Sequence, residues 1–169
     1  MPELDPTSLR AAFGGFATGV TVITTTTEDG DHGMTANAFM SVSLSPPLIS
    51  VSLSRDCRML GHVRQAGRYV VNVLRHDMEA LAWHFAGRSD PSLRDPIARS
   101  DGHPVIAGAV ARFFADLETE VPAGDHVILI GRVTGLSRDP AAEPLLFCGG
   151  RFGRLSPVPR SGNAGDRST

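Results

Sequence analysis

The chain of 169 residues contains no lysine, and all 16 of its basic residues are arginines. Without a lysine amine the protein cannot form a Schiff base with a carbonyl compound, and it lacks the lysine of a nucleotide-binding phosphate loop. A phosphate group bound to this protein must therefore be held by arginine, by hydroxyl groups or by backbone N–H groups.

Cysteine, long apolar runs and net charge are also scarce. The two cysteines, Cys57 and Cys148, show no metal-ligand spacing and follow no secretory leader, so we expect free thiols in a cytoplasmic protein. No apolar run approaches the roughly 18 residues of a membrane span. The net charge of −2 argues against nucleic-acid binding, which needs a clustered basic surface. We expect neither nucleic acid nor a membrane among the partners.

Motifs of hydrolases and of common nucleotide-binding folds are missing as well. The six histidines show no zinc spacing, and no serine lies in a nucleophile elbow. The glycines at 14–19 are not followed by Lys-Ser or Lys-Thr, and those at 149–153 precede no βαβ unit. We therefore expect no metal site and no Rossmann domain. Hydride transfer remains compatible with such a sequence, because a bound cofactor then performs the chemistry.

Residues 33–54 are the most informative stretch that is present. Ile49, Val51 and Leu53 fall on one face of a predicted strand, and serines alternate with them on the other. Pro46-Pro47 divides the stretch, since proline cannot donate to a sheet ladder. The polar face carries few charges, which suits a flat heteroaromatic ligand with carbonyl and ring-nitrogen edges. The same alternation is also typical of an ordinary strand that faces solvent.

The rest of the sequence predicts a mainly β protein with a few short flanking helices. One helix is expected from Asp5-Pro6 to about Gly14-Gly15, packing across a barrel or subunit face, and two more follow Asp56, as a cap, and Asp77. Strands are expected near residues 20–27, 68–74, 109–120, 126–137 and 145–148, with turns at 28–33 and 122–125. Strands without alternating helices favour a Greek-key or closed antiparallel barrel.

Two segments are predicted to be irregular. Residues 87–104 contain Asp-Pro twice and little hydrophobic periodicity, which indicates a long mobile loop. Residues 156–169 hold almost nothing apolar, which indicates a disordered tail after a single domain at 1–155.

The start of the second helix is the best anion site in the sequence. Free N–H groups and the helix dipole would lie there beside Arg55 and Arg58. These two arginines are equally typical of a solvated helix face, so the pattern alone leaves both interpretations open.

The segment Gly33-Met-Thr-Ala-Asn-Ala-Phe39, followed by Ser41-Val-Ser-Leu-Ser-Pro-Pro-Leu48, resembles the flavin-contacting segment of the short-chain flavin reductase family. These proteins are reductase components of two-component flavin-dependent monooxygenases. The likeness is colinear over most of the chain and includes 19–24, 71–74, 108–109, 123–126, 131–133, 144–147 and 150–152. A colinear series is far more specific than any one of its pieces.

The resemblance implies an FMN-binding split β-barrel that forms a homodimer. It implies an NAD(P)H:flavin oxidoreductase that transfers hydride from NADH or NADPH to N5 of FMN or FAD. Diffusible reduced flavin would then serve a partner monooxygenase. A flavin-binding split barrel resembling the pyridoxine-phosphate oxidase group, acting as an oxidase or cofactor carrier, is the alternative, and a binding module without turnover is a third reading.

The resemblance also implies which residues contact the cofactors. The isoalloxazine and ribityl contacts fall on Thr35, Ala36, Asn37 and Ala38, and the same wall continues through Ser41, Val42 and Ser43. The ribityl and phosphate end falls on Ser52, Leu53, Ser54, Arg55, Cys57 and Arg58. Relatives more often carry a hydroxyl residue where Cys57 stands, and a thiol is a poor hydrogen-bond donor.

Five further residues complete the implied site. His126, in Ala-Gly-Asp-His, is implied to contact the nicotinamide side, although a lone histidine at a strand start is also typical of half-exposed packing. Arg151 and Phe152 are implied to lie near the second subunit's site, with closure of the barrel end as the alternative. Phe85 and Arg88 would line the outer end of the flavin site.

Overall fold

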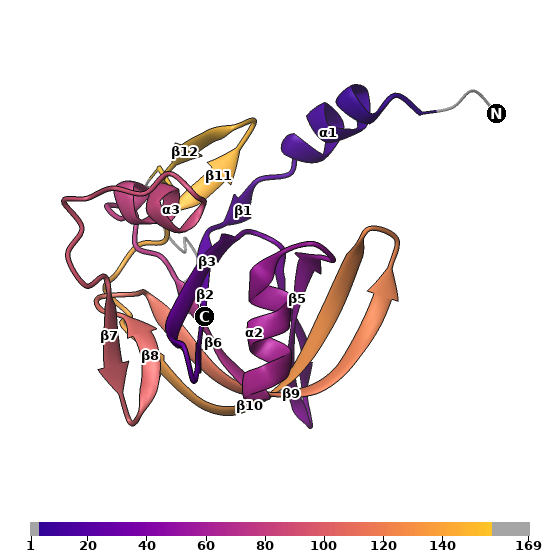
Figure 1. Ribbon diagram of the computed structural model, residues 1–169. Helices are drawn as coiled ribbons and strands as arrows, with labels where there is room; N and C mark the ends of the chain where they lie inside the picture. The colour runs from indigo at the N-terminus through magenta and orange to yellow at the C-terminus, as the bar shows by residue number, and fades with distance from the viewer. Residues whose placement is uncertain (1–3, 157–169) are drawn as a thin grey trace, which may run out of the picture.

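Seven strands form one antiparallel sheet in the order β3-β2-β6-β9-β10-β5-β4 in the computed structural model, which describes residues 4–156 (Figure 1). Its edges are β3 and β4, which do not pair with each other although only Asn37 and Ala38 separate them in the chain. The sheet is therefore an open barrel whose split lies between two consecutive strands. The seven strands are β2 (Thr21–Thr27), β3 (Gly30–Ala36), β4 (Phe39–Leu44), β5 (Pro47–Ser54), β6 (Arg68–Val73), β9 (Ala111–Ala123) and β10 (His126–Arg138).

Two small sheets and three helices flank this barrel (Figure 1). One small sheet joins β1 (Thr18–Gly19), β11 (Leu146–Cys148) and β12 (Arg151–Gly153), and the other is the hairpin of β7 (Ile97–Ser100) and β8 (His103–Ile106). The helices are α1 (Pro6–Gly14), α2 (Arg58–Ala66) and α3 (Glu79–Phe85). The mainly β fold with short flanking helices is confirmed, but the closed barrel is wrong.

The core is formed by two clusters, one on each side of the sheet's centre. In the first cluster Met59, Leu60 and Val63 of α2 pack against the apolar face of β5, as their helical spacing predicts. The second cluster joins Ala82 of α3 to the strands around β2, β8 and β11. The predicted apolar face of β5 is thus buried, and α2 and α3 each make contacts with β3.

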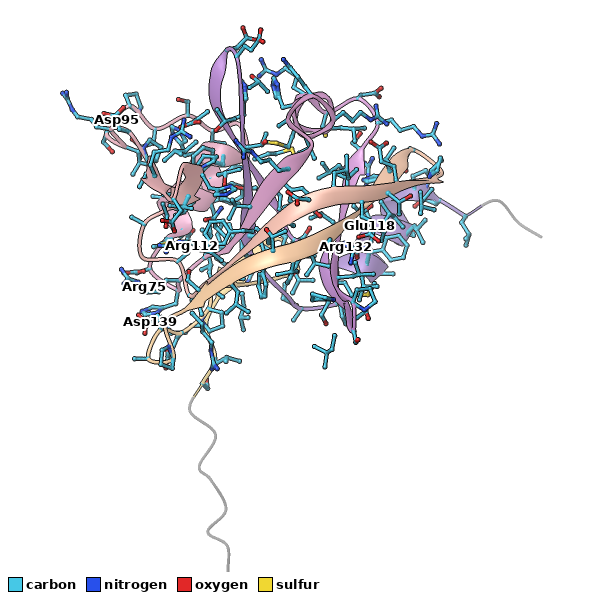
Figure 2. The ribbon with its side chains drawn as sticks, turned by 90° about the horizontal axis from the view of Figure 1, so that it is seen from below. Arg75, Asp95, Arg112, Glu118, Arg132 and Asp139 are labelled. Atoms are coloured by element: carbon cyan, nitrogen blue, oxygen red, sulfur yellow. The ribbon has the colours of Figure 1, made fainter. Side chains whose placement is uncertain are left out.

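The long hairpin of β9 and β10 crosses the barrel and carries an ion pair between its two strands. The Arg132 guanidinium lies 2.7 Å from the Glu118 carboxylate on the neighbouring strand (Figure 2). The hairpin turn is tighter than predicted, because β9 continues to Ala123 and only Gly124 and Asp125 separate the strands. His126 consequently begins β10 at the tip of this hairpin.

The prediction of a mobile loop at 87–104 is wrong for the second half of this segment, where β7 and the start of β8 form a hairpin. Buried Asn72 fixes this hairpin: its Nδ2 donates to the Val22 carbonyl at 2.9 Å, and its Oδ1 accepts from the Ile106 N–H at 2.9 Å. Arg99 adds an ion pair of 2.7 Å with Asp31. These contacts come from distant strands, so local periodicity does not reveal them.

The starts of α1 and α2 are capped differently. Asp5 caps α1 as predicted, since its carboxylate accepts hydrogen bonds from the N–H groups of Thr7 and Ser8. The predicted Asp56 cap is wrong: Cys57 occupies the N-cap position of α2 and makes no side-chain cap bond. The predicted tail at 156–169 lies, apart from Ser156, outside the described residues.

Helix α1 extends from the barrel and buries no residue within the chain (Figure 1). Phe13 and Phe16 are 68% and 78% exposed. The Gly149 N–H donates to the Gly14 carbonyl at 2.7 Å and ties the end of α1 to the small sheet. The helices of the described residues include none that is long and apolar enough to cross a membrane.

Candidate functional site

The split in the barrel is held open by hydrogen bonds that fix the two-residue connection between β3 and β4. The Ala38 carbonyl accepts from the Ser52 N–H at 3.0 Å, and the Ala36 carbonyl accepts from the Thr21 hydroxyl at 2.6 Å. Thr35 is fixed on the other side, since its hydroxyl donates to the Ala82 carbonyl of α3 at 2.7 Å. The backbone at residues 35–38 is therefore preorganised.

A cavity of about 840 Å³, here called the split cavity, lies along this connection. Three residues predicted to contact a flavin line it: Asn37 and Ala38 from the connection, and Ser52 from β5. The remaining lining residues are Phe13, Phe16, Ala17, Thr18, Gly19, Thr21, Phe39, Met40, Ser50, Val73 and Ile128. The cavity combines apolar walls with a few hydroxyl and amide groups, which is the usual character of a site for a flat organic ligand.

A second cavity of about 600 Å³, here called the helix cavity, lies between β3, α2 and the end of α3. Its lining includes two predicted residues, Arg58 and Phe85. The other lining residues are Asp31, His32, Gly33, Met34, Met59, His62, His84, Ala86 and Gly87. The Phe85 ring lies so close to Gly33 that a side chain there would collide with it. Glycine at position 33 thus shapes this cavity.

The segment at 52–58 leads from the split cavity to the helix cavity. Leu53 turns its side chain into the core, so only its backbone remains for a ligand. Arg55 and Arg58 are exposed at the start of α2, and within residues 4–156 neither guanidinium has a hydrogen-bond or ion-pair partner. Because Cys57 leaves the first N–H groups of α2 without a side-chain cap, this helix start is suited to an anion.

The structure places His126 beside this segment, opposite Ser54 in the register of β10 and β5. Its Nδ1 lies 2.7 Å from the Asp125 carboxylate, and this hydrogen bond lowers the pKa of Asp125 below its ordinary value. The Asp125 carbonyl in turn accepts from the Arg55 N–H at 3.0 Å. The hairpin tip and the helix start are therefore connected.

Thirteen predicted residues line neither cavity among the described residues, and six of these also lie outside the 35–38 connection, the 52–58 segment and His126. Ser41, Val42 and Ser43 lie on the edge strand β4, where a bulge interrupts the pairing with β5. Arg151 and Phe152 lie on β12, and Arg88 follows α3. Phe152 packs edge-on against Trp83, and the Arg88 guanidinium lies 3.7 Å above the Trp83 ring. Within one chain, β12 and α3 lie in a different part of the fold from the tip of the β9–β10 hairpin, where His126 begins β10 (Figure 1).

Sequence reasoning also missed residues that line the cavities. Phe13 and Phe16 recur at helical spacing in the sequence, which indicates only a packing face, yet both line the split cavity. His32, His62 and His84 showed no metal-ligand spacing, and they line the helix cavity. The helical spacing of the two phenylalanines could have indicated an exposed apolar face, whereas no local pattern connects three histidines that lie on three elements.

Comparisons with known proteins agree with this geometry. The family described as flavin reductase like domain matches residues 13–156. The NADH-dependent flavin reductase of Rhodococcus sp is 42% identical over 157 residues, which cover 91% of this chain and 89% of the relative. The NADH-dependent FAD reductase of Streptomyces globisporus is 40% identical over 167 residues, covering 95% of this chain and 91% of the relative.

Solved structures show the same likeness. Flavin reductase PheA2 superposes with a TM-score of 0.86 at 42% identity, covering 91% of this chain and 100% of the other. BorF, the flavin reductase component of a bacterial two-component tryptophan halogenase, gives a TM-score of 0.82 at 40% identity, with coverage of 91% and 100%. Together with the colinear motifs and the split barrel, these matches show that the chain belongs to the flavin reductase like family.

Proposed function

We propose that this protein is an NADH-dependent flavin reductase that supplies reduced flavin to a partner monooxygenase. The observation that carries the proposal is the split between β3 and β4, which brings Asn37, Ala38 and Ser52 around one cavity. From there the chain leads directly to the cationic start of α2. One site thus offers neutral groups for a ring system and positive charge for a phosphate.

The residues of the site fit FMN or FAD by their chemistry. The fixed backbone at 35–38 and the amide of Asn37 suit the carbonyl and ring-nitrogen edges of a flavin. Arg55, Arg58 and the uncapped N–H groups of α2 suit its phosphate. When bound, the flavin supplies the hydride-accepting atom N5. The protein's own part is to orient the ring, and to place hydrogen-bond donors where negative charge develops.

We assign to His126 the contact with the nicotinamide cofactor. Asp125 holds the Nδ1 of this ring, so Nε2 remains available for the carboxamide or the diphosphate of NADH. Arg151 and Phe152 lie on β12, outside the split cavity, whereas Phe13 and Phe16, which line that cavity at the end of α1 and just after it, are largely exposed. A homodimer accounts for both facts, because a second chain would cover the phenylalanines and bring its β12 to the site.

Release of the product follows from the same chemistry. Hydrogen bonds from neutral groups hold a flavin without the deep ion pairing that would prevent its departure. Reduced flavin can then diffuse to an oxygenase component, the kind of assembly that the name of BorF describes. The two free thiols agree with a cytoplasmic setting. The alternative of an oxidase or cofactor carrier is disfavoured, because the similar proteins are named as NADH-dependent reductases.

A single assay tests the proposal. Purified protein is mixed in turn with FMN, FAD and riboflavin, and the loss of NADH absorbance is followed for each, with NADPH compared. Rapid loss of NADH that requires flavin is expected. Flavin binding without NADH loss would indicate a cofactor carrier, and neither binding nor loss would indicate a binding module; either result contradicts the proposal.

A further inference from the structure

The helix cavity continues past the residue that would meet a flavin phosphate. Arg58 begins α2 and lines the cavity, and His62, which also lines it, lies one helical turn further along the same helix. With about 600 Å³ the cavity has the size of a complete small-molecule pocket. FMN ends at its phosphate, so binding FMN would leave the part around His62 unfilled.

Two histidines form a flat wall in that unfilled part. The rings of His32 and His62 are parallel within 5°, with centroids 3.6 Å apart. His32 is held by a 2.7 Å hydrogen bond between its Nε2 and the Thr27 hydroxyl. Burial lowers the pKa of His62, and the neighbouring His32 and Arg58 lower it further. These effects favour the neutral form of the His62 ring, which suits stacking better than anion binding.

Two further rings line the same cavity. His84 and Phe85 at the end of α3 meet edge to face, with centroids 5.0 Å apart. The His84 Nδ1 accepts from the Asp90 N–H at 3.0 Å, so the Nε2 of a neutral His84 carries the proton and is a donor. Asp31, the acidic lining residue, is paired with Arg99. The cavity thus has a cationic entrance at Arg58 and flat heteroaromatic walls beyond it.

We propose that the helix cavity binds the adenosine end of FAD, with Arg58 at the diphosphate and the adenine against the His32–His62 stack. This inference rests on the proposed flavin reductase function and adds a preference for FAD over FMN. Stacking of a purine on an aromatic side chain changes affinity by about ten-fold or more, whereas FMN has no group that reaches His62.

Equilibrium titrations test the proposal without relying on turnover. For the unmodified protein we expect Kd for FAD to be at least about ten-fold lower than Kd for FMN. His62→Ala should raise Kd for FAD by about ten-fold and leave Kd for FMN unchanged. His62→Phe, which retains a flat ring, should keep the affinity for FAD. Gln65→Ala is the matched control, because Gln65 lies on the same helix and lines a different hollow.

Three results would overturn the proposal. Equal affinities of the unmodified protein for FAD and FMN would show that the adenosine makes no contact. Equal loss of both flavins in His62→Ala would assign the cavity to a part that they share. A raised KM for NADH with unchanged flavin affinities would assign it to the adenosine of NADH. In each case FMN-dependent NADH oxidation would still support the reductase, so the two proposals fail separately.

Discussion

Arg55 and Arg58 are the residues that bring positive charge to the candidate site, and both are exposed where α2 begins. Asn37, Ser52 and the backbone at 35–38 bring hydrogen-bonding groups without charge. Binding of FMN or FAD is served by this division, because a phosphate is held best by charge whereas a ring edge needs only oriented dipoles. At the residue scale, substitutions can therefore remove phosphate binding without removing ring binding, and the reverse.

Replacing Arg58 with alanine should weaken FMN binding by about ten-fold or more, because a charge-assisted hydrogen bond contributes about 1.5–3 kcal/mol. Riboflavin has no phosphate, so its Kd should not change. Fluorescence titration measures both affinities, and Arg94→Ala, an exposed arginine outside both cavities, is the control. Equal weakening of FMN and riboflavin would remove the phosphate assignment.

Replacing His126 with alanine should raise the KM for NADH by about five- to ten-fold, the effect of losing one hydrogen bond to a substrate. The Kd for FMN should change by less than about two-fold. Steady-state kinetics at saturating flavin and a separate flavin titration provide the two values. Thr134→Val, an exposed change further along β10, is the matched control. If both values rise together, His126 supports the fold of the site rather than NADH binding.

At the scale of elements, the parts of the fold that the sequence predicts are those whose pattern is local. Helix α1 follows from its Asp5 cap, and β5 from the alternation of Ile49, Val51 and Leu53. The hairpin of β7 and β8 does not, because it is fixed by Asn72 and Arg99 through contacts with distant strands. The helix cavity likewise depends on contacts between distant segments, because its three histidines lie on three elements that only the folded chain brings together.

Replacing Asn72 with leucine should lower the free energy of unfolding by about 2–4 kcal/mol, because it leaves the buried Ile106 N–H without its partner and breaks the link to Thr24. Urea unfolding followed by circular dichroism measures this loss. Thr134→Val replaces an exposed hydroxyl and should stay within about 0.5 kcal/mol of the unmodified protein. A loss for Asn72→Leu no larger than the control's would show that the buried network contributes little.

At the scale of the whole molecule, one chain does not gather all the residues of the proposed site in one place. Helix α1 extends from the barrel with exposed phenylalanines that line the split cavity, while Arg151 and Phe152 lie on another sheet. Exposed aromatic surface beside a cavity is typical of an interface. The proposed homodimer follows from this arrangement rather than from any single residue.

The double variant Phe13→Glu and Phe16→Glu should therefore convert a dimer to a monomer, because burying two carboxylates in an apolar interface is unfavourable. Light scattering during gel filtration measures the mass, and circular dichroism should show the barrel intact. Leu136→Glu, at a similarly exposed leucine that lines neither cavity, should remain dimeric. A monomeric unmodified protein, or a dimer unaffected by the double variant, would contradict the proposed interface.

The most direct test of the central claim is a crystal structure of the protein soaked with FMN. We expect the isoalloxazine ring against residues 35–38 in the split cavity, with one face open towards His126, and the phosphate at the start of α2 beside Arg58. A split cavity that stays empty at saturating FMN, or one in which the flavin binds elsewhere, would contradict the account.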